Sequence, residues 1–176
     1  VDHFVFDFWF NEPRSPWDIV NEDLLPYLPL SSYASEAGVA FVFWNWDATK
    51  QDAVEHINID NELGERTGPV EVSPISEIYN NITINYCQTG SDSQFRKSMT
   101  YTHDSYGKGE NFIQDAYSYA SFTRYGERIG PVIDCPTIER DSTAAAILDW
   151  NIRYFSQSRR SVSYVLGQKF QSLDLG

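Results

Sequence analysis

The residues best placed to do chemistry together are Asp52 and His56, four positions apart in a segment that could form a short helix. That spacing puts both side chains on one helix face, where a carboxylate and an imidazole could bind the same metal ion. Two ligands do not complete a site, and the other histidines, His3 and His103, are distant in the sequence. An exposed ion pair between Asp52 and His56 is the better interpretation. We therefore expect no metal site and no cofactor.

Nucleophilic catalysis would need a serine or cysteine placed beside a histidine and a carboxylate. The chain has no Gly-x-Ser-x-Gly elbow, no cysteine–histidine motif, and no glycine-rich loop of the phosphate-binding type before a helix. We expect no catalytic residues, no cofactor-binding residues and no enzyme activity.

Carboxylates next to aromatic rings are the remaining combination of residues that could carry out chemistry. Trp44, Trp46 and Asp47 could set a carboxylate beside rings that stack on sugars, as in carbohydrate-binding or glycan-cleaving modules. Trp44 and Trp46 also alternate along a probable strand, so the two rings could simply pack on one face. Both interpretations stay open, and the carbohydrate module is the alternative function.

Composition excludes several partners. The 176 residues include 25 acidic and 13 basic side chains, for a net charge of −12. Binding to duplex DNA needs clustered lysine and arginine, so no tight nucleic-acid binding is expected. No apolar run approaches the ~18 residues of a membrane span, so no membrane partner is expected either. An aromatic content of 15% indicates a chain that folds.

The two cysteines, Cys87 and Cys135, form neither a disulfide framework nor a zinc ligand set. Both lie in apolar, strand-like runs, which favours buried free thiols. A single bridge between them is also compatible with the sequence.

Strand and helix patterns alternate along the chain. Ser15 as N-cap and Pro16 at the first helical position predict a helix start, and Pro26 and Pro29 predict its end. Gly126 follows a predicted helical turn, where a positive φ is typical. Aromatic and β-branched runs predict strands at 4–10, 38–46, 70–72, 81–87, 95–101 and 161–166, with loops at 58–68 and 102–111.

The clearest helix runs from Ser142 to about Gln157, with Asp141 or Ser142 as its cap. Its apolar stripe consists of Ala145, Leu148, Ile152 and Phe155. We expect this stripe to pack on a sheet that contains the 161–166 strand. The predicted class is α+β and β-dominated, with one long helix packed on a sheet. An N-terminal α/β region would span residues 1–70, and a second domain residues 71–176.

The order of several short motifs resembles the tail-hub and tail-tip (baseplate hub-like) structural proteins of tailed bacteriophages and prophages. In that family an N-x-I-x-V-x-Y strand precedes an S-x-x-x-Y-G-x-R segment, an alanine-rich helix, a strand and an L-x-L-G-D-x-V turn. The matching segments are Asn80-Asn81-Ile82-Thr83-Ile84-Asn85-Tyr86, Ser121-Phe122-Thr123-Arg124-Tyr125-Gly126-Glu127-Arg128, the 142–157 helix, Val162 to Leu166 and Leu173-Asp174-Leu175-Gly176. The order and spacing carry the likeness, since no single motif is specific.

The resemblance implies a structural function without chemistry. Such hubs are built on β-barrel domains related to the tail-tube fold and form a ring that joins the tube to the spike or fibres around the ejection channel. The expected partners are copies of the chain, in a ring that is a trimer for the full-length protein, and neighbouring tail proteins. The expected location is the virion tail, after synthesis in the bacterial host cytoplasm. Because the family continues beyond the position of Gly176, we expect a segment of a longer protein whose barrel-like domain is truncated at its C-terminus.

Overall fold

The computed structural model describes residues 5–7, 13–35, 38–43, 63–66, 68–89 and 93–166. The chain divides into two compact units, each built from two separate stretches of sequence. The first unit comprises Val1–Leu28 and Pro74–Ser158, and the second comprises Pro29–Ser73 and Arg159–Gly176. This division differs from the expected one at residue 70, because the N-terminal stretch packs with the later part of the chain.

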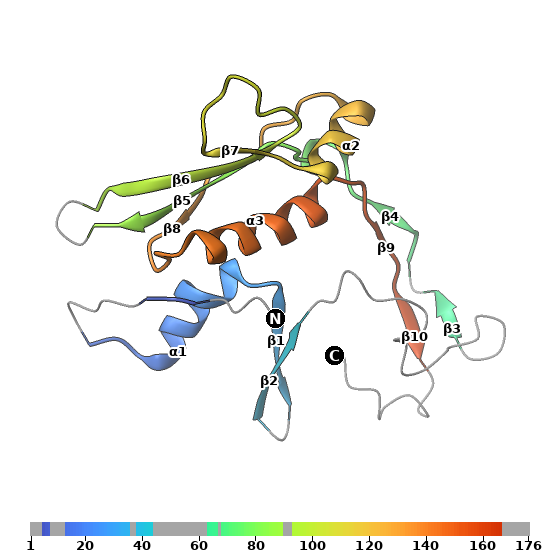
Figure 1. Cartoon of the computed structure of the whole chain (residues 1–176). Helices are drawn as coiled ribbons and strands as arrows, with labels where there is room; N and C mark the ends of the chain where they lie inside the picture. The colour runs from blue at the N-terminus through green and yellow to red at the C-terminus, as the bar shows by residue number, and fades with distance from the viewer. Residues whose placement is uncertain are drawn as a thin grey trace. The chain divides into compact units, whose positions relative to one another are not determined.

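Short helices and strands alternate along the described residues (Figure 1). The helical elements are α1 (Pro16–Asp18), η1 (Ile19–Leu24), η2 (Leu25–Tyr27), η3 (Ile75–Glu77), α2 (Ala116–Tyr125) and α3 (Asp141–Phe155). The strands are β1 (Leu30–Ser35), β2 (Gly38–Phe43), β3 (Leu63–Arg66), β4 (Glu71–Val72), β5 (Ile82–Gln88), β6 (Phe95–Thr102), β7 (Phe112–Gln114), β8 (Ile133–Cys135), β9 (Arg160–Ser161) and β10 (Tyr164–Leu166).

A mixed four-stranded sheet, in the order β7-β6-β5-β8, forms the centre of the first unit. β5 pairs antiparallel with β6, whereas the outer strands β7 and β8 run parallel to their neighbours. The predicted alternation along β5 is confirmed, because Ile82, Ile84 and Tyr86 are all buried on one face. That face therefore has to be covered by another layer.

Helix α3 supplies this layer (Figure 1). Leu148 and Ile152 of the predicted stripe are fully buried, together with Ala144 and Ile147. Ala145 and Phe155 are only half-buried, so the buried face is rotated relative to the predicted stripe. The helix begins at Asp141, and its N-cap residue, Arg140, makes no capping bond through its side chain.

The N-terminal stretch is tied to this core at several points. The Val5 amide donates to Thr143 Oγ1 at 3.2 Å, and the Asp7 amide donates to the Thr137 carbonyl at 2.7 Å. Residues 5–7 form no strand, although the sequence predicts one over 4–10. Further along, the Trp150 indole donates to the Tyr27 carbonyl at 3.0 Å.

The helix start at Ser15 is confirmed, since its Oγ accepts a hydrogen bond from the Trp17 amide at 3.2 Å and Pro16 follows it. Pro26 does not end the helical segment, because it lies inside η2. The first residues of a helix have no intrahelical acceptor for their amides, so the missing amide proton of a proline there costs nothing.

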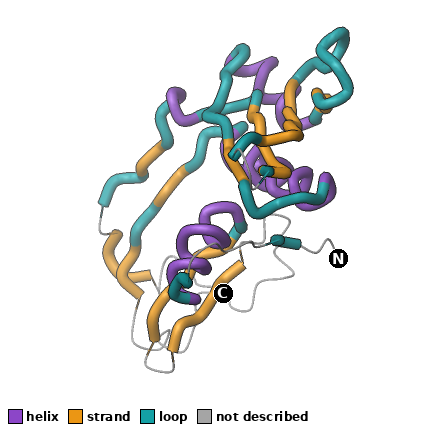
Figure 2. The backbone as a smooth tube through the Cα atoms, turned by 90° about the vertical axis from the view of Figure 1, so that its left-hand side faces the viewer, coloured by secondary structure: helices purple, strands orange, loops and turns teal. Residues whose placement is uncertain are grey.

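Two-stranded pairs make up the described part of the second unit: β1 with β2, β3 with β10, and β4 with β9, all antiparallel. β4 and β9 run side by side as a short ribbon (Figure 1, Figure 2). The predicted 161–166 strand is thus divided between β9 and β10, and α3 packs on β5 and β6 instead of on this strand. β3 lies where a loop is predicted.

The fold is mixed α and β. Helix and strand take comparable shares of the described residues, so the expectation of a β-dominated chain is not met. None of the sheets formed by the described strands closes into a barrel. One long helix does pack on a sheet, as predicted.

The packing of α3 gives a stability prediction. Leu148→Ala removes a fully buried side chain and should lower the free energy of unfolding by about 2–5 kcal/mol in a denaturant melt. As a control, Tyr119→Ala truncates a side chain that is 57% exposed and should cost less than about 0.5 kcal/mol. A Leu148→Ala loss as small as that of the control would contradict the packing.

Gly126 gives a second prediction. Its φ of 74° and ψ of −177° lie in a region that only glycine adopts easily, so the predicted positive φ is confirmed. A Cβ there would meet nothing within 4 Å, so any cost is one of backbone strain. Gly126→Val should destabilise the protein by about 1–3 kcal/mol. Gly68→Val, where space is also free and φ is not positive, is the control. Equal denaturant midpoints for the two variants would refute the strain.

Candidate functional site

Most residues singled out from the sequence lie outside the described residues. These are His3, Trp44, Trp46, Asp47, Asp52 and His56. The interpretations of the Asp52–His56 pair and of the tryptophans remain predictions.

His103 is described, and it packs against α2. Its ring stacks face to face on Phe122, with centroids 3.7 Å apart and planes inclined by 1°. Its Nδ1 is buried and has no hydrogen-bond partner. The hydroxyls of Thr102 and Ser118 are also buried and also lack a partner. This histidine therefore serves to pack α2 against the end of β6.

Both cysteines are free thiols, as the sequence favours. Cys135 is fully buried on β8, and its burial, helped by the charge of Asp134, raises its pKa to about 12. Such a thiol stays protonated at neutral pH and is a poor nucleophile. Cys87 is half-buried, with a positive φ of 59°.

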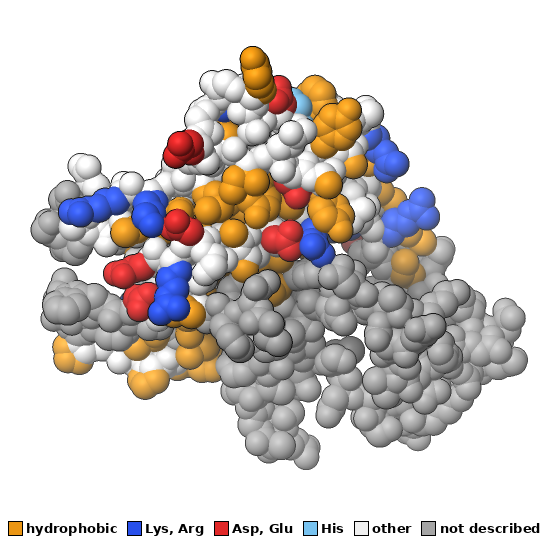
Figure 3. Space-filling model, viewed as in Figure 1, with side chains coloured by type: hydrophobic (Ala, Val, Ile, Leu, Met, Phe, Trp, Pro, Cys, Tyr) orange, Lys and Arg blue, Asp and Glu red, His pale blue; other side chains and the backbone are white. Residues whose placement is uncertain are grey.

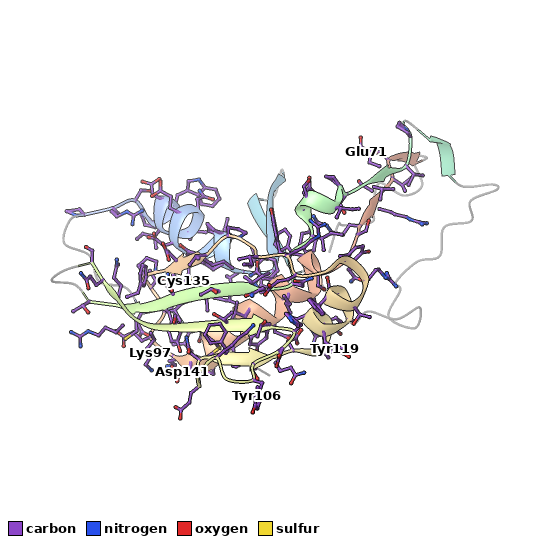
Figure 4. The ribbon with its side chains drawn as sticks, turned by 90° about the horizontal axis from the view of Figure 1, so that it is seen from above. Glu71, Lys97, Tyr106, Tyr119, Cys135 and Asp141 are labelled. Atoms are coloured by element: carbon purple, nitrogen blue, oxygen red, sulfur yellow. The ribbon has the colours of Figure 1, made fainter. Side chains whose placement is uncertain are left out.

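A group of three polar side chains surrounds the N-terminus of α3. Tyr86 and Lys97 are register partners on β5 and β6, so their side chains share the face covered by α3. Asp141 Oδ1 accepts hydrogen bonds from Lys97 Nζ at 2.7 Å and from the Tyr86 hydroxyl at 3.1 Å. Lys97 and Asp141 lie next to each other in Figure 4. The carboxylate also interacts favourably with the helix dipole.

The protonation states of this group suit a clamp better than a catalyst. Burial, followed by the hydrogen bond to Asp141, raises the pKa of Tyr86 to about 12. The bond from Lys97 lowers the pKa of Asp141, and the same contact raises that of Lys97. All three groups therefore keep their usual charge at neutral pH, and none is adjusted for proton transfer there.

A second group, which we call the Tyr101 face, consists of Tyr101, Ile113, Asp115, Tyr117 and Asp149. Tyr101 and Ile113 are register partners on β6 and β7, on the sheet face covered by α3. Burial, followed by the charges of Asp149 and Asp115, raises the pKa of Tyr101. The tyrosine is therefore close to a carboxylate of α3 and to another at the start of α2.

Each carboxylate of the Tyr101 face already has a structural partner. Asp115 Oδ2 caps α2 by accepting from the Ser118 amide at 2.7 Å. Asp149 Oδ2 lies 3.1 Å from Nε of Arg153, whose guanidinium carbon is 5.1 Å from the centre of the Tyr117 ring. Sequence reasoning missed this group, although the Asp149–Arg153 spacing and the position of Asp115 before a helix are both visible signals.

Large apolar side chains are exposed around this face. Figure 3 shows apolar side chains gathered there among charged ones. Tyr117 is 41% exposed, Tyr119 57%, and Tyr106, on the loop between β6 and β7, 92%. Tyr106 and Tyr119 are labelled in Figure 4. The loop is ordered by its own bonds, from the Tyr106 amide to Asp104 Oδ1 at 2.9 Å and from the Lys108 amide to the Ser105 carbonyl at 3.2 Å.

The described residues offer neither a metal site nor a membrane-spanning helix. In the part of the chain that the structure describes, no group of three or more histidine, cysteine, aspartate or glutamate side chains is placed to hold a metal ion. None of the described helices has the length and apolar character needed to cross a membrane.

The chain matches no family model, no curated protein and no solved structure. What can be said about its function therefore depends on its own residues.

The clamp at α3 predicts a pH dependence. Because the folded-state pKa of Asp141 is lowered, its stabilising contribution is present above the ordinary aspartate pKa and is lost as the pH falls through the lowered value. The free energy of unfolding should therefore fall less between pH 7 and pH 3 for Asp141→Asn than for the wild type, as measured in denaturant melts. The effect should be small, because the pair is exposed. Lys97→Gln should show the same reduced acid dependence, and an acid dependence like that of the wild type in both variants would disprove the clamp.

Proposed function

We propose that this chain is a non-catalytic structural subunit that assembles with copies of itself and with neighbouring proteins. In its specific form the proposal is a component of a bacteriophage tail tip or baseplate hub. There it would join a ring between the tail tube and the spike or fibres, around the ejection channel. The resemblance in motif order supports this specific form, and the described surface supports the general one.

The observation that carries the proposal is the exposure of large apolar side chains on ordered elements. Tyr106 and Ile129 are 92% and 72% exposed, and Tyr119 is 57% exposed on α2. Aromatic residues are enriched in protein interfaces, and clustered exposed apolar residues mark interaction sites. The Tyr106 loop is already ordered, so burying it in a contact would cost little conformational entropy.

The polar groups of the described site support a role without catalysis. Asp115 caps a helix, Asp149 pairs with Arg153, and Asp141 binds Lys97. Each of these carboxylates therefore has a structural role that accounts for its position.

The finer features belong to the same proposal. The central sheet of the first unit would be part of a β-barrel related to the tail-tube fold, completed by chain beyond the described strands. The full-length protein would form a trimeric ring and reside in the virion tail. The acidic balance, with a net charge of −12, suits a channel that passes DNA without binding it.

One observation favours the alternative, a carbohydrate-binding or glycan-cleaving module. Two carboxylates, Asp115 and Asp149, are near Tyr101 on a surface with an exposed Tyr117 ring. Carboxylate pairs beside aromatic rings cleave glycosidic bonds in many enzymes. The structural partners of both carboxylates make this the weaker candidate.

Three measurements test the proposal together. Sedimentation velocity over a range of concentrations should show a sedimentation coefficient that rises as the chain associates. A panel of cell-wall glycans should show no turnover. A mobility shift with duplex DNA at physiological salt should show no retardation, because too few basic residues offset the negative charge.

Each opposite result contradicts the proposal in its own way. A monomer at every concentration would contradict assembly. Glycan turnover that Asp149→Asn abolishes would establish the alternative, and tight, salt-sensitive DNA binding would contradict both functions.

A further inference from the structure

The β4–β9 ribbon has one apolar face. Val72 and Arg160 are register partners, so their side chains are on the same face. The period of two in extended chain places Val70 and Val162 on that face too, and continuing the register sets them opposite each other. We call this surface, formed by Val70, Val72, Arg160 and Val162, the valine ribbon. Glu71 and Ser161 point to the opposite face.

The valine ribbon is uncovered. Val70 is 42% exposed, Val72 57% and Val162 41%. A two-stranded ribbon is marginally stable alone and usually needs an apolar face packed on another layer. Arg160 is also exposed and has no ion-pair partner among the described residues. The face therefore combines three valines with one unpaired positive charge.

We propose that the valine ribbon of one copy binds the Tyr101 face of a second copy. The two surfaces are complementary in chemistry. Each offers apolar side chains, valines on one and Ile113 with Tyr117 on the other. The ribbon carries a single cation, whereas the Tyr101 face carries Asp115 and Asp149, of which Asp149 is already paired with Arg153. Arg160 would approach Asp115, whose Oδ2 alone is used in capping α2.

A second copy fits better than an unrelated acidic protein because the chain itself presents both halves of the contact. Two different surfaces of one chain that bind each other give a head-to-tail contact, the type that builds rings. This inference rests on the proposed self-assembly and names the surfaces through which it occurs.

Substitutions that remove charge but keep structure test the contact. Arg160→Gln removes the cation, and Asp115→Asn removes the carboxylate charge while keeping a good helix cap. Each should weaken self-association about fivefold in sedimentation equilibrium of the 176-residue chain. Because the two groups contact each other in the complex, the double variant should be no weaker than either single variant.

Val72→Asp places a carboxylate in the apolar centre and should weaken association more strongly, by about twentyfold or more. Arg140→Gln is the matched control for Arg160→Gln, since it removes a cation from an exposed position whose side chain makes no capping bond. Glu71→Gln is the control for the opposite ribbon face. Both controls should associate like the wild type, and thermal melts should show that every variant is folded.

The outcomes separate this inference from the proposed function. If the wild type associates but Arg160→Gln, Asp115→Asn and Val72→Asp do so equally well, the valine ribbon is not the interface, and self-assembly stands. Additive losses in the double variant would place Arg160 and Asp115 in separate contacts and overturn the pairing. A monomeric wild type would overturn both proposals.

Discussion

The packing of α3 on the inner strand β5 is the interaction on which the first unit depends. Ile84, Ile147 and Leu148 have no exposed surface, and the residues packed around them come from both stretches of the unit. Burial of such side chains contributes about 1.5–3 kcal/mol each, far more than the exposed polar contacts at the ends of α3. This packing also sets the positions of the clamp at Asp141 and of Asp149 in the Tyr101 face, because both residues belong to α3.

The sequence predicts those elements whose burial has a clear period. β5 alternates strictly, and α3 repeats every three to four residues, so both are visible without coordinates. β7 and β8 are only three residues long, too short to show a pattern in the sequence. They form because they pair with β6 and β5, respectively, and this pairing is not visible in the local sequence. The Tyr101 face cannot be predicted from the sequence, for a related reason. Its members come from β6, β7, α2 and α3, and only tertiary packing brings them together.

The carboxylates around α2 and α3 have structural partners, and large apolar side chains near them are exposed. Asp115 caps α2 and Asp149 pairs with Arg153, while Tyr106, Tyr119 and Ile129 remain in solvent. Where exposed apolar side chains form a contiguous patch on a protein, the patch usually marks an interaction site. In the contact that we propose between copies, the valine ribbon with Arg160 and the Tyr101 face with Asp115 would cover each other.

The division of the first unit has a consequence for synthesis. The Val5 amide bonds to Thr143, a partner 138 residues later in the chain. During translation, at roughly 5–20 residues per second, the first stretch leaves the ribosome many seconds before β5, β6 and α3 exist. Its apolar residues, Phe6 and Tyr27 among them, stay without their core in that interval. Contacts of such long range slow folding, so the nascent chain is most exposed to aggregation and to chaperone binding before residue 158 emerges.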